Sequence, residues 1–176
     1  AFYPIYIGEI DQIGHLYGPH SKELYKSVAK LDSMIEQCAR KFLEKDRNTK
    51  FVFLGDHGMT TVKKIIDIEN IIYSLFKKMG LLAGRDYIYF LDSTMFRIWF
   101  IKPGSTLLLK NTLFSNQVLL GNGIFINKEI ANAYSIPHND RRYGDVIWWA
   151  NSGVLIFPDY FHNMKPYKGM HGYRPD

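Results

Sequence analysis

The chain has 176 residues, 47% hydrophobic and 22% charged, which is the composition of a globular domain and not of a disordered segment. No uninterrupted apolar run approaches the ~20 residues that a membrane-spanning helix needs, and the single cysteine, Cys38, excludes an internal disulfide. The formal net charge of +5 comes from scattered basic residues, so the sequence lacks the concentrated basic face that would indicate nucleic-acid binding.

The first third of the chain predicts a strand, a loop, a helix and a second strand. Residues 1–7 are largely apolar and aromatic, which favours a strand, whereas two glycines and a proline within residues 11–19 favour a loop over a helix. Apolar side chains spaced by three and four residues predict a helix over 21–45, with Cys38 on its buried stripe. The continuous apolar run 51–54 is typical of a buried parallel strand.

The remaining elements complete an α/β pattern. A helix is expected over 67–79, an antiparallel pair of strands over 87–91 and 96–101, and two further strands over 146–150 and 154–157. The turn-rich stretch 102–143 gives no assignment. Because the first strand, helix and second strand follow one another as in a βαβ unit, we expect an α/β domain with a mainly parallel sheet flanked by helices.

Side chains of metal-ligand type follow both strands predicted in the first third. Asp11 and His15 come after the first, Asp56 and His57 come after the second, and His171 lies in a loop near the end. Ligands of such sheets bind beyond the carboxyl ends of the strands, so we expect these five side chains to converge there. Carboxylate oxygen and imidazole nitrogen are the usual ligands of zinc and its borderline neighbours.

A single loop aspartate or histidine is more often a turn residue or a surface polar group than a ligand. Two Asp/His pairs after two neighbouring strands favour a metal site over that interpretation. The other histidines lack such a setting and are interpreted as surface or loop residues: His20, His138 and His162.

Three motifs carry a resemblance to a known family. They are Asp11-x-x-Gly14-His15-x-x-Gly18-Pro19, Gly55-Asp56-His57-Gly58-Met59 and Gly169-Met170-His171-Gly172-Tyr173. In this order, over nearly the whole chain, they resemble the metal-binding motifs of the type I phosphodiesterase/nucleotide pyrophosphatase family, in the alkaline phosphatase superfamily. The resemblance implies an alkaline phosphatase-like fold and hydrolysis of phosphodiester or pyrophosphate bonds with two zinc ions and a threonine nucleophile.

The resemblance also implies a ligand set. Asp11, His15 and His171 would hold one zinc, and Asp56 with His57 would contribute to the second. In the family, the nucleophile and a further metal-binding aspartate lie upstream of the first motif, and neither has a counterpart here. The second zinc site is therefore expected to be incomplete.

We accordingly expect residues 1–176 to be the C-terminal part of a phosphodiesterase/alkaline phosphatase-like domain, truncated at its N-terminus. The parent protein would be a phosphodiesterase/nucleotide pyrophosphatase-like hydrolase acting on a small-molecule phosphate ester or nucleotide. This segment by itself would be inactive.

Two alternatives stay open. One is a phosphomonoesterase, phosphonate hydrolase or mutase of the same superfamily. The other is a non-catalytic module that binds metal or phosphate without hydrolysis.

Overall fold

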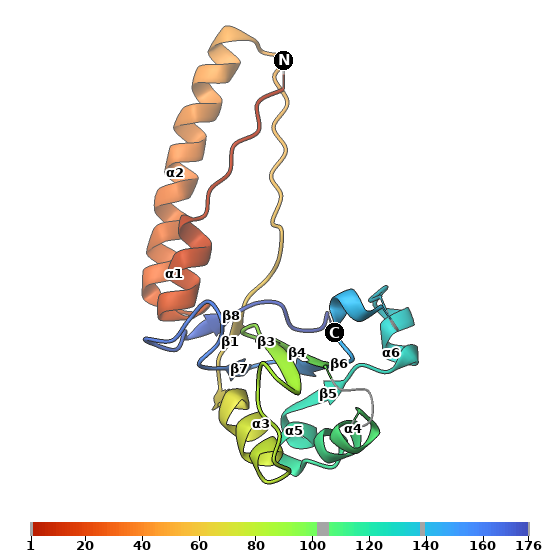
Figure 1. Ribbon diagram of the computed structural model, residues 1–176. Coiled ribbons are helices and arrows are strands. Elements are labelled where there is room, and N and C mark those ends of the chain that lie inside the picture. Colours follow the sequence, from red (N-terminus) through yellow and green to blue (C-terminus); the bar gives the residue numbers. More distant parts are fainter. Residues whose placement is uncertain (1, 102–105, 138–139, 176) are drawn as a thin grey trace. The chain divides into compact units, whose positions relative to one another are not determined.

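A computed structural model of the chain has a mixed α/β fold that divides into two compact units (Figure 1). The residues it describes are 2–101, 106–137 and 140–175. Unit 1 comprises Ala1–Val62 and Tyr167–His171, and unit 2 comprises Lys63–Pro166 and Gly172–Asp176.

Unit 1 contains two helices and a small sheet. Its elements are α1 (Glu9–Tyr17), α2 (Lys22–Lys45), and the antiparallel strands β1 (Thr60–Thr61) and β8 (Gly169–Met170). The helix predicted over 21–45 is confirmed, and it begins where the Ser21 hydroxyl accepts a 3.1 Å hydrogen bond from the Leu24 amide. No helix in the described part of the chain is both long and apolar enough to cross a membrane.

The loop predicted over 11–19 is wrong, because helix α1 includes residues 11–17. Of the three helix-breaking residues, only Gly14 lies inside the helix. Gly18 is its C-cap, with a φ of 94° and an amide that donates to the Gly14 carbonyl at 2.8 Å. Pro19 follows that cap. Glycine and proline at these positions end a helix without preventing it.

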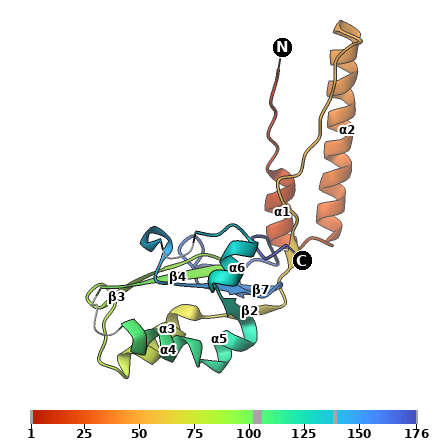
Figure 2. The ribbon, with the colours of Figure 1, turned by 90° about the vertical axis from the view of Figure 1, so that its right-hand side faces the viewer.

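The strands predicted over 1–7 and 51–54 are also wrong for the described residues, which are extended but assigned to no strand. These segments run alongside α2 (Figures 1 and 2), and Phe42 of that helix contacts the Tyr3 and Phe51 rings at centroid distances of 6.1 and 6.3 Å. Within the described part of the chain, neither segment has a partner strand, and apolar composition without a partner does not make a sheet.

The consequences extend to the rest of unit 1. Without those strands the predicted βαβ unit does not form, and a mainly parallel sheet is not confirmed. The apolar stripe of α2 is covered only in part, so Val28 is 46% exposed. Cys38, which was expected in the core, is exposed as well.

Unit 2 contains an antiparallel sheet of four strands in the order β3-β4-β6-β5 and a parallel pair, β2 with β7. The strands are β2 (Lys64–Ile66), β3 (Tyr87–Leu91), β4 (Met95–Phe100), β5 (Gly123–Phe125), β6 (Val146–Ala150) and β7 (Val154–Ile156). All four strands predicted in this half are confirmed.

Helices cover one face of that sheet, where α3, α4 and α5 lie together (Figure 2). The helices of unit 2 are α3 (Ile68–Lys77), α4 (Thr106–Phe114), α5 (Gln117–Asn122), α6 (Lys128–Ala133) and a 3-10 turn at Arg141–Tyr143. Helix α3 confirms the helix predicted over 67–79. The others lie within residues 102–143, a stretch that has no assignment from its sequence pattern.

Trp148 is the largest fully buried side chain among the described residues, and it belongs to the core of unit 2. Its ring stacks on Phe96 at a centroid distance of 5.5 Å, and its indole N–H donates to the Leu119 carbonyl at 3.1 Å. The residue therefore combines a large buried apolar area with a satisfied polar group.

We predict that Trp148→Ala lowers the free energy of unfolding by about 3–5 kcal/mol, because it leaves a cavity and an unpaired carbonyl. Met164→Ala is the matched control: this side chain is 95% exposed, and the change should stay within about 0.5 kcal/mol. Urea unfolding followed by far-ultraviolet circular dichroism measures both. A loss below about 1 kcal/mol for Trp148→Ala would contradict this account of the core.

Candidate metal centre

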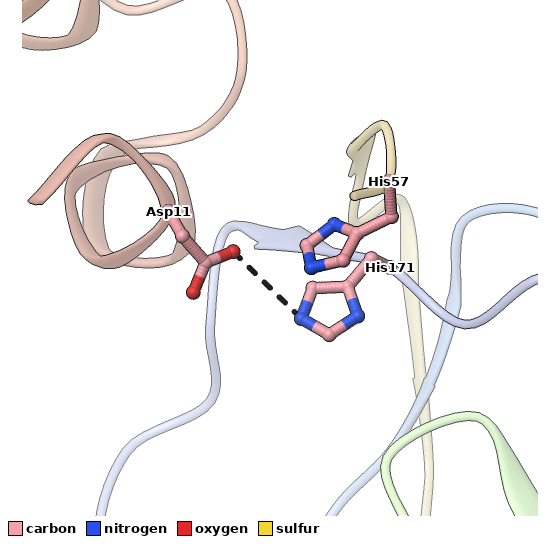
Figure 3. Close-up of side chains that lie close together, drawn as sticks. All are labelled: Asp11, His57 and His171. Atoms are coloured by element: carbon pink, nitrogen blue, oxygen red, sulfur yellow. Dashed lines mark ion pairs between the residues drawn. The ribbon is translucent and has the colours of Figure 1, made fainter. Parts of the chain in front are cut away.

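Three side chains of unit 1 form a compact cluster of potential metal ligands. Asp11, His57 and His171 each offer one ligand atom, and these atoms lie within 4.8 Å of one another (Figure 3). Asp11 comes from helix α1, His57 from the extended segment before β1, and His171 directly follows β8. The fold of unit 1 thus brings together residues from distant parts of the sequence.

His15 joins this cluster because it lies one helical turn after Asp11, on the same face of α1. Its Nδ1 is 2.8 Å from the Gly169 carbonyl oxygen, and its Nε2 is 3.4 Å from Asp11 Oδ2. A carbonyl oxygen only accepts, so in a neutral imidazole Nδ1 carries the proton and Nε2 keeps its lone pair. That orientation is the one found in metal-binding histidines, whose second nitrogen is fixed by a backbone carbonyl.

The Asp11 carboxylate has an unsatisfied oxygen. Asp11 Oδ1 is buried, and no described residue gives it a hydrogen bond. Its ion-pair neighbour, His171 Nε2, is 3.7 Å away, which is beyond hydrogen-bonding distance. A buried carboxylate oxygen without a partner is costly, and a cation would satisfy it. The residues present therefore fit a bound metal ion.

The imidazole rings of His57 and His171 stack, with centroids 3.8 Å apart and an angle of 26° between the planes. The pKa of His171 is lowered, first by burial, and then by the neighbouring charges of His57 and His15 when these are protonated. Asp11 and Asp56 act in the opposite direction but do not reverse the shift. His171 therefore tends to stay neutral, which is the form that binds metals.

Asp56 lies at the exposed edge of the site, with 75% of its side chain accessible. One carboxylate oxygen accepts a 3.0 Å hydrogen bond from the His57 amide, and the other lies 3.7 Å from His57 Nε2. Four of the five predicted residues thus lie close together: Asp11, His15, His57 and His171. Asp56 contacts this cluster through His57. How the five are shared between two ions stays a prediction.

Two of the remaining histidines are placed as expected. His20 is exposed, and His162 is a partly exposed loop residue that contacts Asp159. His138 lies outside the described residues.

Two features that support the site have no signature in the sequence. The Tyr167 ring lies 4.7 Å from the His15 ring, and the Gly169 carbonyl orients the same imidazole. A backbone carbonyl has no side-chain signature, and Tyr167 belongs to no periodic pattern. Their proximity to the third motif was the only available signal.

Comparison with known proteins establishes the family. The family described as type I phosphodiesterase / nucleotide pyrophosphatase matches residues 1–103, more than half of the chain, and the chain belongs to this family. The matched region contains Asp11, His15, Asp56 and His57, whereas His171 lies beyond it.

Curated relatives match shorter segments. Human ectonucleotide pyrophosphatase/phosphodiesterase family member 7 is 41% identical over 64 residues, covering 34% of this chain and 14% of that protein. The catalytic subunit of human GPI ethanolamine phosphate transferase 3 is 42% identical over 52 residues, covering 30% of this chain and 4% of that protein. The chain therefore corresponds to a small part of these relatives.

Solved structures match nearly the whole chain. Human ectonucleotide pyrophosphatase/phosphodiesterase 5 superimposes with a TM-score of 0.67 at 21% sequence identity, covering 94% of this chain and 41% of that one. The murine protein of the same name gives a TM-score of 0.65 at 23% identity, with the same coverage. At this identity the likeness shows that the fold is shared.

We predict that His171 in the metal-free chain titrates below the ~6.5 of an unperturbed imidazole. Because its folded pKa is lowered, the unfolded chain binds this proton first as pH falls. The free energy of unfolding therefore decreases as pH falls from the pKa of His171 in the unfolded chain toward its lower pKa in the folded chain. Imidazole NMR, with His171→Asn to identify the signal and the urea-unfolded chain as reference, measures the shift. A folded pKa equal to or above that in urea would contradict this description of the site.

Proposed function

We propose that this chain carries metal-binding residues of a site for metal-dependent hydrolysis of phosphodiester or pyrophosphate bonds. The observation that carries the proposal is the buried, unsatisfied Asp11 Oδ1, with ligand atoms of His57 and His171 within 4.8 Å of an Asp11 ligand atom. Family membership gives this site its chemistry, because the family is that of the type I phosphodiesterases and nucleotide pyrophosphatases.

We assign Asp11, His15 and His171 to one zinc ion, and Asp56 with His57 to a second. The neutral imidazoles add no charge of their own, and the two carboxylates offset only part of the charge of two divalent ions. The site would therefore remain positive and attract an anionic phosphate. When bound, two such metal ions supply Lewis-acid stabilisation of charge on the phosphoryl oxygens and lower the pKa of a nucleophile.

Neighbouring groups in this chain orient the metal-ligating side chains. The Gly169 carbonyl fixes the His15 ring through its 2.8 Å contact with Nδ1, so that Nε2 faces Asp11. Burial keeps a proton from competing for His171 near neutral pH.

Catalysis itself belongs, in this proposal, to a longer polypeptide. The threonine nucleophile and one carboxylate ligand implied by the family have no counterpart among residues 1–176, and the chain covers 41% of the solved relatives. We therefore expect residues 1–176 alone to be inactive.

The proposed substrates are nucleotides or other small phosphate esters. One relative with the same fold, an inactive variant of the murine ectonucleotide pyrophosphatase/phosphodiesterase 5, was solved in complex with AMP. That complex supports a nucleotide or a related phosphate ester as the substrate class.

A second candidate is transfer of a substituted phosphate to an alcohol instead of water. It is favoured by the similarity to GPI ethanolamine phosphate transferases, among them transferase 1 of Yarrowia lipolytica, which is 41% identical over 54 residues. The 54 matched residues cover 29% of this chain and 6% of that protein. The same ligands would serve both reactions, which differ in the acceptor.

We predict that the chain binds zinc and that Asp11→Asn weakens binding by more than ~100-fold, the upper range for loss of an outer partner of a ligand. His20→Gln should leave the affinity unchanged, because this exposed histidine lies outside the cluster. Competition with a chromophoric chelator at neutral pH measures both variants. Equal weakening by the two substitutions, or no zinc binding by the unaltered chain, would overturn the proposed metal site.

A second experiment tests the reaction. A polypeptide that joins residues 1–176 to the rest of the family fold should hydrolyse bis-(p-nitrophenyl) phosphate faster than p-nitrophenyl phosphate, and a chelator should abolish the activity. Faster turnover of the monoester would favour the phosphomonoesterase alternative. Transfer of the substituted phosphoryl group to an added alcohol in preference to water, with release of p-nitrophenolate, would favour the transferase.

A further inference from the structure

The three segments that carry the ligands come together at a place where two of them contribute a glycine. Gly14 precedes His15 in helix α1, and Gly169, in strand β8, lies two residues before His171, which follows that strand. The side chain of Met59, two residues after His57, reaches both glycines. Each contact is thus one or two residues from a proposed ligand.

The distances show how closely the groups fit. A Cβ atom added at Gly14 would lie 2.6 Å from Met59 Sδ, and one added at Gly169 would lie 2.7 Å from the same sulfur. At Gly169 the added atom would also lie 2.5 Å from the Gly14 carbonyl oxygen. The thioether therefore occupies space that either side chain would need, while the two backbones approach each other directly.

We propose that Met59 is a positioning residue whose thioether, packed against Gly14 and Gly169, holds the three ligand-bearing segments at the spacing the metal site needs. This inference rests on the proposed function, because it assumes that the site binds zinc. An unbranched, polarisable thioether suits the role, since it can fill a narrow space between two backbones.

The two glycines differ in a way that makes the proposal testable. At Gly14 both contacts shorter than 3.4 Å are to the flexible end of Met59, so shortening Met59 removes the conflict. At Gly169 one contact is to backbone, so shortening Met59 leaves the conflict in place. Met59→Ala should consequently reduce the effect of Gly14→Ala on zinc affinity, but not the effect of Gly169→Ala.

The experiment compares zinc affinities of the chain by chelator competition, with folding checked by circular dichroism. We expect Gly14→Ala and Met59→Ala each to weaken binding by about tenfold or more, and the double variant to bind better than the product of the two effects predicts. Gly169→Ala should weaken binding equally with and without Met59→Ala. The matched control is Gly121→Ala, a helical glycine with open space around it, which should not change the affinity.

The outcomes separate the inference from the function on which it rests. If the unaltered chain does not bind zinc, the proposed function fails. If that chain binds zinc but Met59→Ala binds equally well, or if Met59→Ala rescues neither or both glycine variants, the positioning role is overturned. Should Gly14→Ala fail to fold, Met59→Ala and Met59→Leu still test the role: Leu, which keeps most of the volume, should weaken binding less than Ala.

Discussion

The site depends on one short segment, Tyr167–His171, which is hydrogen-bonded on two sides within unit 1. The Lys168 amide donates to the His15 carbonyl, and the Lys168 carbonyl accepts from the Val62 amide, both at 2.8 Å. The next carbonyl oxygen, that of Gly169, accepts a 2.8 Å hydrogen bond from His15 Nδ1. These bonds hold helix α1 and the chain after His57 on either side of the segment that ends at His171. The ligands converge because backbone groups are paired in this way.

Much of the fold could be predicted because it follows local rules. Helix α2 has a periodic apolar stripe and a serine cap, and β3 with β4 has two β-rich runs around a short turn. The errors arose where local rules are insufficient. Local rules count Gly14 as a helix breaker, yet it lies buried inside α1. The apolar segments 2–7 and 51–54 have strand composition, but a strand also requires a partner.

The candidate site was predictable as a set of residues and much less so as a geometry. Aspartate and histidine are conspicuous in a sequence, and the order of the motifs indicated that they belong together. The geometry depends on groups without such signatures: the Gly169 carbonyl, the space at Gly14 and the reach of Met59. Strands β1 and β8, which align these groups, have only two residues each and leave no periodic pattern.

We propose that Asp11, His57 and His171 share one metal-binding environment, in which a cation would satisfy the unpaired Asp11 carboxylate oxygen. Zinc titration of the nitrogen-15-labelled chain, followed through its imidazole signals, tests that claim most directly. We expect the ring nitrogens of His15 and His171, which are assigned to one zinc ion, to shift together and to saturate at the same zinc concentrations. Those of His57, assigned to the second and incomplete site, should shift at the same or higher concentrations, while those of His20 stay unchanged. Saturation of His15 and His171 at different concentrations, or no shift at either ring, would contradict the account.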